Sequence, residues 1–141
     1  MNIVVDANIL IAALLKDSSI REIIINTDNQ LLVPEIHFEE IEEHKNELLE
    51  KSSLSEEDFY ALISRLSKYF KIINNDEILP FIEEAENIMG KIDKDDVPII
   101  ATSLAYGVCP IWSDDSHFKQ QKKIKIFTTK EMIYEEISHQ S

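Results

Sequence analysis

Acidic residues stand directly after several short apolar runs of this sequence. The first is Asp6, which follows the apolar residues 3–5. Similar runs precede or follow further acids, at Glu39-Glu40, at positions 93 to 96 and at Asp114-Asp115. Because parallel α/β sheets form their sites at the carboxyl ends of the strands, we expect these acids to meet at one edge. Carboxylates gathered there repel one another unless cations lie between them, and oxygen ligands of this kind suit a pair of divalent metal ions.

Each of the later groups holds more than one acid, so one member has to be chosen. In the second group the helical phase favours Glu40, which is adjacent to Ile41 and one turn from Ile36, at the boundary between core and water. Glu39 is the less favoured alternative in that segment. The sequence therefore predicts that Glu40 points toward a site.

The third and fourth groups leave the register open by one residue. Asp93 and Asp96 are three residues apart and share a face if that turn is already helical, although one acid of the group is expected to cap the helix. Asp114 and Asp115 follow an apolar run, and one of them is again a candidate cap. Asn8 is expected to accompany Asp6, either as a helix cap or as a donor that orients its carboxylate.

Other catalytic chemistries find little support in the sequence. Two glycines cannot form a glycine-rich phosphate loop, and Cys109 has no evident activating histidine. The four histidines show no convincing metal-ligand spacing; they are His37, His44, His117 and His139. Metal-supported chemistry by carboxylates is the one catalytic option that the motifs favour.

The charge balance points away from nucleic acid when it is taken alone. With 14 Lys and Arg against 27 Asp and Glu, the formal net charge is −13, whereas phosphate binding normally uses a basic surface. Four lysines nevertheless follow Asp115 closely, at positions 119, 122, 123 and 125. Lys119, Lys122 and Lys123 are candidates for substrate phosphate contacts, and a solvated loop is the alternative explanation.

The elements that must position these acids alternate along the chain. Short strands are predicted at 2–5, 30–33, 72–73, 108–112 and 124–127. Helices are predicted at 8–15, 34–49, 78–89, 95–106 and 129–137, with a further helix that ends at residue 26 and another that follows Asp58. This order predicts an α/β fold, a three-layer α/β/α sandwich with a central, mostly parallel sheet. The length of 141 residues and 44% hydrophobic content fit a single domain over residues 1–141.

The sequence also bears on where the protein is located in the cell and on whether it forms a homodimer. No run of eighteen apolar residues occurs, so no membrane span is expected, and the N-terminus lacks the basic segment of a secretory signal. A single cysteine fits the reducing cytoplasm. A helical apolar stripe after Asp58 is expected to form part of a homodimer surface, with a plain core helix as the alternative; it consists of Phe59, Leu62, Ile63, Leu66, Tyr69 and Phe70.

With these acids in place, the chain resembles the PIN-domain nucleases, and in size and layout the toxin ribonucleases of VapBC-type toxin–antitoxin pairs. Four motifs carry the resemblance, in order along essentially the whole chain: residues 4–8, residues 33–41, residues 96–101 and residues 111–115. The resemblance implies an α/β/α sandwich that binds Mg²⁺ or Mn²⁺ and hydrolyses RNA in the cytoplasm. It also implies an antitoxin protein as a partner.

The resemblance further implies which residues form the site. The metal-binding and catalytic acids of the family fall on Asp6, Glu40, Asp96 and Asp115. Asp93 is a plausible fifth acid and Asp114 is the alternative to its neighbour. Ser113 matches a small hydroxyl residue two positions before the last acid, and Asn8 matches a polar residue that accompanies the first.

Two other classes of protein place acids in similar positions. A phosphatase of the haloacid dehalogenase type needs a second Asp two residues after the first, and Asn8 stands there instead. A non-catalytic α/β interaction module would use its acids as helix caps and its acidic helices to dock a basic partner. Metal titration separates that alternative from a nuclease.

Overall fold

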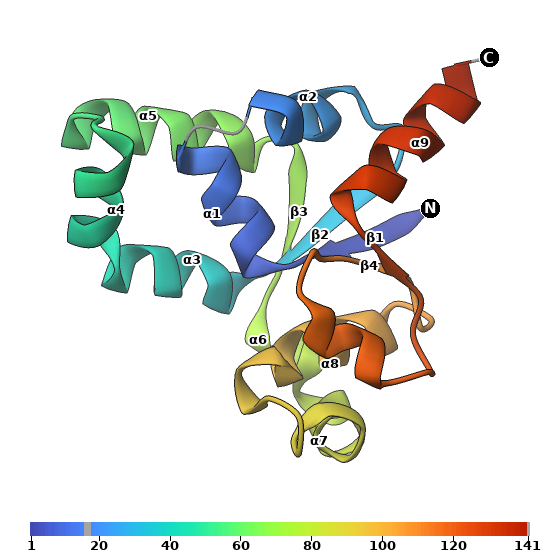
Figure 1. The fold of residues 1–141 in the computed structure, drawn as a ribbon. Helices are drawn as coiled ribbons and strands as arrows, with labels where there is room; N and C mark the ends of the chain where they lie inside the picture. The colour runs from blue at the N-terminus through green and yellow to red at the C-terminus, as the bar shows by residue number, and fades with distance from the viewer. Residues whose placement is uncertain (16–17, 141) are drawn as a thin grey trace.

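The protein, seen here in a computed structural model that describes residues 1–15 and 18–140, is built on a five-stranded parallel sheet. The strand order is β3-β2-β1-β4-β5, so β1 lies at the centre (Figure 1). The strands are β1 (Asn2–Val5), β2 (Gln30–Pro34), β3 (Phe70–Ile73), β4 (Ile111–Trp112) and β5 (Ile126–Phe127). The predicted α/β fold with a parallel sheet is confirmed.

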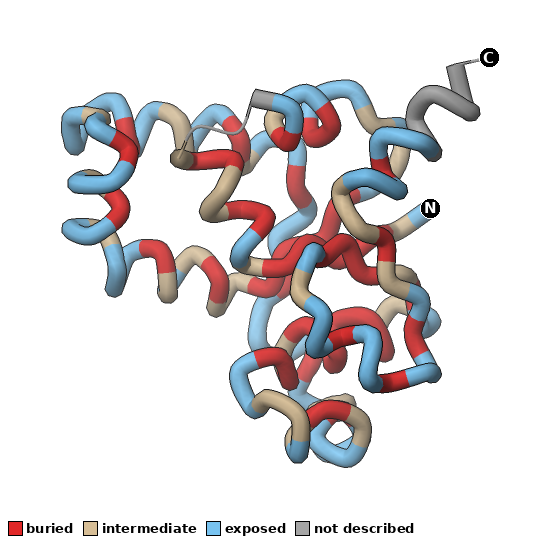
Figure 2. Tube along the Cα trace, viewed as in Figure 1, coloured by how far each residue is buried: buried red, intermediate tan, exposed pale blue. Residues whose placement is uncertain are grey.

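Helices cover both faces of this sheet, which explains why its central strands are almost wholly apolar (Figure 2). Side chains alternate between the faces, because successive residues of a strand point in opposite directions. Ile3 and Val5 therefore join one core, while Val4 joins the other. Packing in both cores fixes the positions of the strand ends. The residues that directly follow the strands are therefore also held in place.

The helical layers differ in content. One core contains residues of α1 (Ala7–Leu15), α2 (Ser18–Asn26), α5 (Glu56–Ser67) and α9 (Thr129–Gln140), together with Ile41 and Leu48 from the two helices between β2 and α5. The other contains residues of α6 (Asn75–Ile78), α7 (Ile82–Met89) and α8 (Val97–Ala105). The remaining helices, α3 (Glu35–Glu43) and α4 (Lys45–Ser52), link β2 to α5 at the side where β1 and β2 end (Figure 1). No helix among the described residues is long and apolar enough to cross a membrane.

Two predicted helices are interrupted in the structure. The helix expected over 34–49 is divided into α3 and α4 at His44, whose backbone leaves the helical region at φ −100° and ψ 15°. The helix expected over 78–89 is divided by a 3₁₀ turn, η1 (Leu79–Phe81). Pro80 lies in this turn, and its ring and missing N–H disfavour a continuous α-helix.

Two later elements begin differently from their predicted patterns. Instead of a strand over 108–112, Gly107 and Val108 have positive φ values of 74° and 59°, so the chain turns before β4 begins. The helix predicted from residue 95 starts with a 3₁₀ turn, η2 (Lys94–Asp96), and continues as α8. A further 3₁₀ turn, η3 (Ser116–Gln120), follows the fourth acidic group.

The apolar stripe of α5 mostly serves the core of its own chain. Phe59 and Leu66 are buried, Phe70 continues into β3 as a buried residue, and Leu62 and Ile63 are partly buried against the same core. This burial agrees with the alternative of a core helix for most of the stripe, while Tyr69 is exposed. A homodimer through the remaining exposed residues stays a prediction.

Candidate metal centre

The two central strands bring Asp6 and Ser113 together at the carboxyl edge of the sheet. Asp6 follows β1 and Ser113 follows the neighbouring strand β4, and the backbone N–H of Asp6 donates to the carbonyl of Trp112 over 3.0 Å. The Ser113 hydroxyl donates to Oδ2 of Asp6 over 2.7 Å and accepts the backbone N–H of Asp115 over 3.0 Å. One buried hydroxyl therefore links the first and fourth acidic segments.

Asp6 is buried, with 3% of its surface exposed, and it also begins α1. Its carbonyl accepts the N–H groups of Ile9 and Leu10, and its carboxylate accepts the N–H groups of Ala7 and Asn8. The capping and site interpretations of this residue are thus compatible. Burial raises the pKa of the Asp6 carboxyl, and these hydrogen bonds only partly offset that effect. Asn8 contacts the Asp6 carboxylate through its backbone N–H, and Asn8 is exposed.

The third acidic segment divides its tasks between two residues. Asp93 caps η2, with Oδ1 accepting the N–H of Asp95 over 2.9 Å. Asp96 is 9% exposed, and its Oδ2 is buried without a hydrogen-bond partner. Burial, together with the charges of Asp93, Asp6 and Asp115, raises the pKa of Asp96 to about 7. A buried carboxylate oxygen in this state is an attractive ligand for a cation.

The two residues of the fourth acidic group, Asp114 and Asp115, have different tertiary contacts. Asp114 accepts the backbone N–H and the hydroxyl of Thr129 over 2.7 Å and 2.6 Å, so it holds the start of α9. Asp115 instead caps η3 by accepting the N–H of His117 over 2.9 Å, and its charge raises the pKa values of Asp6 and Asp96. Of the two residues, Asp115 is therefore the one whose charge acts on Asp6 and Asp96.

Glu40 lies at the inner side of α3. Burial and the charges of Asp95, Glu43 and Asp6 raise its pKa, which places its carboxylate within the electrostatic reach of the other acids. Glu39 is exposed. The side chain of Glu40 remains 39% exposed, and its Oε2 lies 3.8 Å from Nδ1 of the buried His37.

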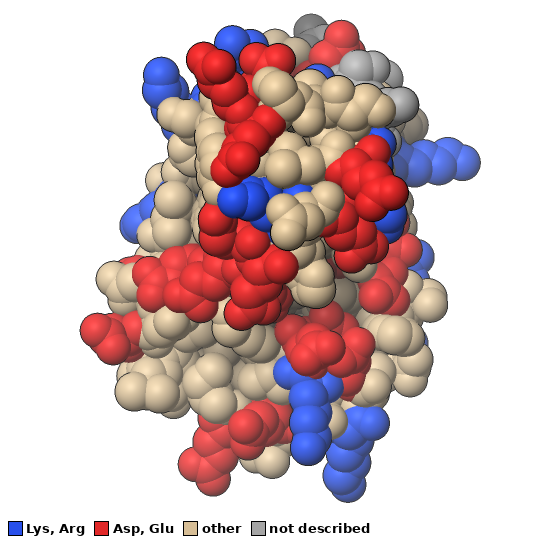
Figure 3. Space-filling model, turned by 90° about the vertical axis from the view of Figure 1, so that its left-hand side faces the viewer, with Lys and Arg blue, Asp and Glu red and all other residues tan. Residues whose placement is uncertain are grey.

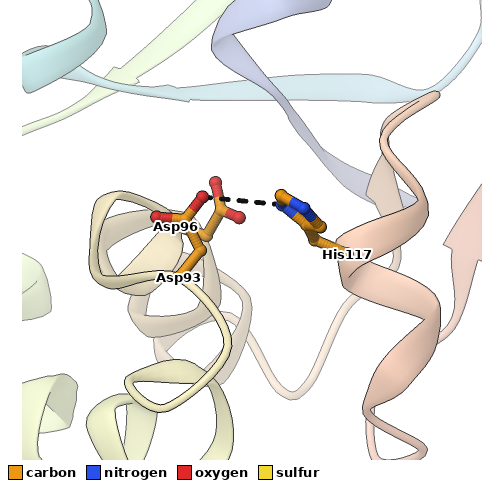
Figure 4. A group of neighbouring side chains, drawn as sticks. All are labelled: Asp93, Asp96 and His117. Atoms are coloured by element: carbon orange, nitrogen blue, oxygen red, sulfur yellow. Dashed lines mark ion pairs between the residues drawn. The ribbon is translucent and has the colours of Figure 1, made fainter.

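A compact group of potential ligands contains Asp93, Asp96 and His117, whose ligand atoms lie within 4.8 Å of one another (Figure 4). It includes only one of the four acids expected to share an ion. Asp6 and Asp115 are electrostatic neighbours of Asp96 in this group. The charges that act on Glu40 are instead those of Asp95, Glu43 and Asp6, so Glu40 is related to the group through Asp6. His117, which the sequence analysis set aside for lack of ligand spacing, therefore belongs to the candidate site.

The chain has a match among known protein families. The family model described as PIN domain matches residues 4–138. The chain belongs to the PIN-domain family.

The fold of this PIN domain is shared with a solved structure. The crystal structure of VapBC2 from Rickettsia felis, bound to a DNA fragment from their promoter, aligns with a TM-score of 0.71 at 15% sequence identity. The alignment covers 91% of the PIN domain and 98% of that chain. At this identity the likeness establishes the fold. None of the curated protein sequences compared with the chain matches it.

The surface of the PIN domain around the site is acidic. Figure 3 looks onto the side where β1 and β2 end, and acidic side chains predominate there. A groove of about 370 Å³ is lined by Asn8, Asp114 and Asp115 together with Ile9, Ala12 and Ile20. A polyanion approaching the site therefore meets repulsion unless cations are bound.

The three candidate lysines of the PIN domain are not equivalent. Lys119 and Lys122 are exposed and line one shallow pocket together with Gln121. Lys123 is paired with Glu84 of α7. An existing carboxylate partner reduces the attraction of Lys123 for phosphate, so Lys119 and Lys122 are the better placed of the three.

The PIN domain meets the chemical requirements of a divalent-cation site. The available donors are carboxylate oxygens and one imidazole nitrogen, the carboxyls of Asp6, Glu40 and Asp96 all have raised pKa values, and one buried oxygen lacks a partner. A bound cation offsets each of these unfavourable features at once. The residue missed by sequence reasoning, His117, had one available signal: it follows Asp115 by two residues in a turn capped by that acid.

Proposed function

We propose that this PIN domain is a ribonuclease that hydrolyses RNA phosphodiester bonds with the help of Mg²⁺ or Mn²⁺. Family membership supports a nuclease, and the site geometry supports dependence on a metal ion. The single observation that carries the proposal is the buried, unpartnered Oδ2 of Asp96, which lies among acids whose charges raise the pKa of Asp96.

Asp6, Glu40, Asp96 and Asp115 are the proposed metal ligands and catalytic residues. When bound, the ion would supply Lewis acidity toward a phosphoryl oxygen and would lower the pKa of a coordinated water. The carboxylates would hold the metal ion where it offsets the repulsion between the acidic surface and the phosphates of RNA. His37 is unsuited as a general base, since burial lowers its pKa to about 4 and its ring nitrogens lack hydrogen-bond partners.

Ser113 acts through the residues it joins. Its hydroxyl fixes one oxygen of Asp6 and positions the backbone of Asp115, so two proposed ligands from distant segments keep a constant separation. Asp93 and Asn8 support the same edge, the first by capping η2 and the second through its backbone N–H. Lys119 and Lys122, with a smaller contribution from Lys123, are proposed to contact substrate phosphates.

The biological role proposed is that of the toxin in a toxin–antitoxin pair, acting in the cytoplasm. The likeness to the VapBC2 chain supports this role, and the acidic surface of Figure 3 suits a basic segment of a partner protein. An antitoxin partner and a homodimer are both parts of this proposal.

A cleavage assay tests the proposed activity. Purified protein is incubated with single-stranded RNA in the presence of Mg²⁺, Mn²⁺ or EDTA. We expect cleavage with either metal and none with EDTA. Cleavage that persists in EDTA, or at the same rate in Asp6→Asn, would reject the proposed site.

Metal titration separates the nuclease from the non-catalytic interaction module. If the acids serve only as caps, calorimetry with Mn²⁺ gives no heat of binding and Mn²⁺ leaves the thermal melt unchanged. A nuclease site predicts both a binding isotherm and a higher melting temperature.

A further inference from the structure

His117 is the only nitrogen donor in the compact ligand group of the described residues. Its Nδ1 lies 3.5 Å from Oδ2 of Asp93 and 3.4 Å from Oδ1 of Asp115. Figure 4 shows the imidazole of His117 facing the carboxylates of Asp93 and Asp96 across the gap between η2 and η3. Two 3₁₀ turns from distant parts of the chain thus present three potential ligands to one point.

The separations are informative. Good hydrogen bonds between nitrogen and oxygen span about 2.7–3.2 Å, and the two distances at His117 exceed that range. Ligand atoms around one divalent ion at about 2.1 Å lie about 3–3.5 Å apart when adjacent and about 4.2 Å apart when opposite. The ligand atoms of the three side chains all lie within 4.8 Å of one another. With small adjustments, this spacing matches that of ligands around one divalent ion.

An independent observation points to a cation at the same place. Among the described residues, Oδ2 of Asp96 is buried and has no hydrogen-bond partner, and the ion pairs of His117 are with Asp93 and Asp115. A protonated imidazole serving only as a counter-charge would leave that oxygen unsatisfied. An ion between the three side chains satisfies it.

The caps explain how the group is held in place. Asp93 uses Oδ1 to accept the N–H of Asp95, so its other oxygen, Oδ2, is left to face His117. Asp115 accepts the backbone N–H of His117 and so sets the start of η3, on which the imidazole is carried. The side chain of His117 is 47% exposed, which leaves it accessible to a hydrated ion.

We propose that Nδ1 of His117 is a metal ligand, together with Asp93 and Asp96, and that this nitrogen makes the site favour transition-metal ions over Mg²⁺. The inference rests on the proposed metal-dependent function. It adds His117 and Asp93 to the ligands proposed above, with Asp96 common to both sets, and it assigns the metal preference to His117. Imidazole is a softer donor than carboxylate and adds more affinity for ions such as Co²⁺ than for Mg²⁺, which prefers oxygen and retains its water.

Direct detection of the nitrogen is the decisive experiment. Mn²⁺ is added to the metal-free protein, and electron spin-echo envelope modulation is recorded for the parent, His117→Gln and His44→Gln. We expect ¹⁴N coupling in the parent and in His44→Gln, a matched exposed histidine outside the group, and loss of the coupling in His117→Gln. Absence of ¹⁴N coupling in the parent, or its survival in His117→Gln, overturns the proposal.

Calorimetry tests the preference. His117→Gln is expected to raise the Kd for Co²⁺ about tenfold or more and the Kd for Mg²⁺ less than about threefold. Equal losses for both ions, or no loss, contradict the assigned preference. Thermal melts in EDTA verify that the exposed substitution leaves the fold intact.

Failure of this inference is distinguishable from failure of the nuclease proposal. If His117→Gln binds metal as the parent does and RNA is cleaved with Mg²⁺, the nuclease stands and the nitrogen ligand is rejected. If the parent shows ¹⁴N coupling but cleaves no RNA, the ligand assignment stands and the nuclease is rejected.

Discussion

Ser113 and Asp6, 107 residues apart in the sequence, are joined by a buried hydrogen bond of 2.7 Å. The bond connects the ends of two adjacent parallel strands, β1 and β4. Because the same hydroxyl accepts the N–H of Asp115, it relates two proposed metal ligands to each other. The contact is therefore both a structural link and a means of orienting a carboxylate.

Ser113→Ala tests this double role. The loss of a hydrogen bond that lowers the pKa of Asp6 raises that pKa further, so protons compete better with metal. We expect Mn²⁺ affinity and cleavage to fall about 10–100-fold, with a stability loss of about 1 kcal/mol. Calorimetry and urea denaturation measure the two effects.

The matched control is Ser103→Ala. Ser103 is also fully buried and donates its hydroxyl hydrogen to the carbonyl of Cys109, away from the acids. We expect a similar loss of stability and unchanged Mn²⁺ affinity. If both variants lose metal affinity equally, the effect of Ser113 is only structural.

Asp6→Asn is expected to abolish cleavage while leaving the fold intact. Since burial raises the pKa of Asp6, its ionised form is disfavoured in the folded protein, and the neutral amide relieves that cost. The metal-free variant should melt at the same or a higher temperature than the parent at pH 7. The rise in melting temperature that Mn²⁺ causes in the parent should disappear.

Asp114→Ala provides the opposite result. Asp114 holds Thr129 at the start of α9, so its removal should cost about 1 kcal/mol of stability while cleavage is retained. Loss of cleavage in a folded Asp114→Ala protein would show that the fourth ligand was assigned to the wrong member of the doublet.

In the metal-free protein, the pH dependence of stability should be reduced because His37 acts against the acids with raised pKa values, of which Asp96 has the large shift. The pKa of Asp96 is raised to about 7, so its contribution to the free energy of unfolding falls as the pH rises from about 4 to 7. The pKa of His37 is lowered to about 4, so its contribution is lost as the pH falls from 6.5 to about 4. Each contribution amounts to at most about 3–4 kcal/mol.

Single substitutions should reveal these opposing contributions. In Asp96→Asn the free energy of unfolding should rise more steeply with pH than in the parent between about 4 and 6.5, because the opposing contribution of Asp96 is removed while His37 still titrates. In His37→Phe it should decrease with pH toward about 7. Urea denaturation in EDTA from pH 4.5 to 7 gives these slopes, and a slope in Asp96→Asn that is no more positive than the slope in the parent would contradict the assignment.

Lys122→Ala should weaken binding of RNA and reduce the slope of log affinity against log salt by about one unit. Lys123→Ala is the comparison, and its effect should be smaller because Glu84 already neutralises this side chain. Fluorescence anisotropy with labelled RNA, a catalytically inactive Asp6→Asn background and a salt series provide the measurement. Identical slopes in the parent and Lys122→Ala would exclude a phosphate contact.

Sequence alone determined the features that depend on local patterns. Apolar runs and helical periodicity identified the five strands within a few residues, and the run before Asp6 located it at the end of β1. These patterns reflect burial of each element on one or both faces, which the side-chain sequence records directly. They are weaker where the chain turns, so His44 and Pro80 divided helices that the periodicity treated as continuous.

Only the tertiary structure decided which polar side chains meet. Asp114 and Asp115 are indistinguishable as neighbours in a sequence, but Thr129 binds the first and Ser113 contacts the backbone of the second. His117 joined Asp93 because η2 and η3, from opposite sides of β4 in the chain, fold against the same edge. A hydrogen bond or a ligand group depends on distances of a few ångströms between segments distant in the chain, and local periodicity carries no information about such distances.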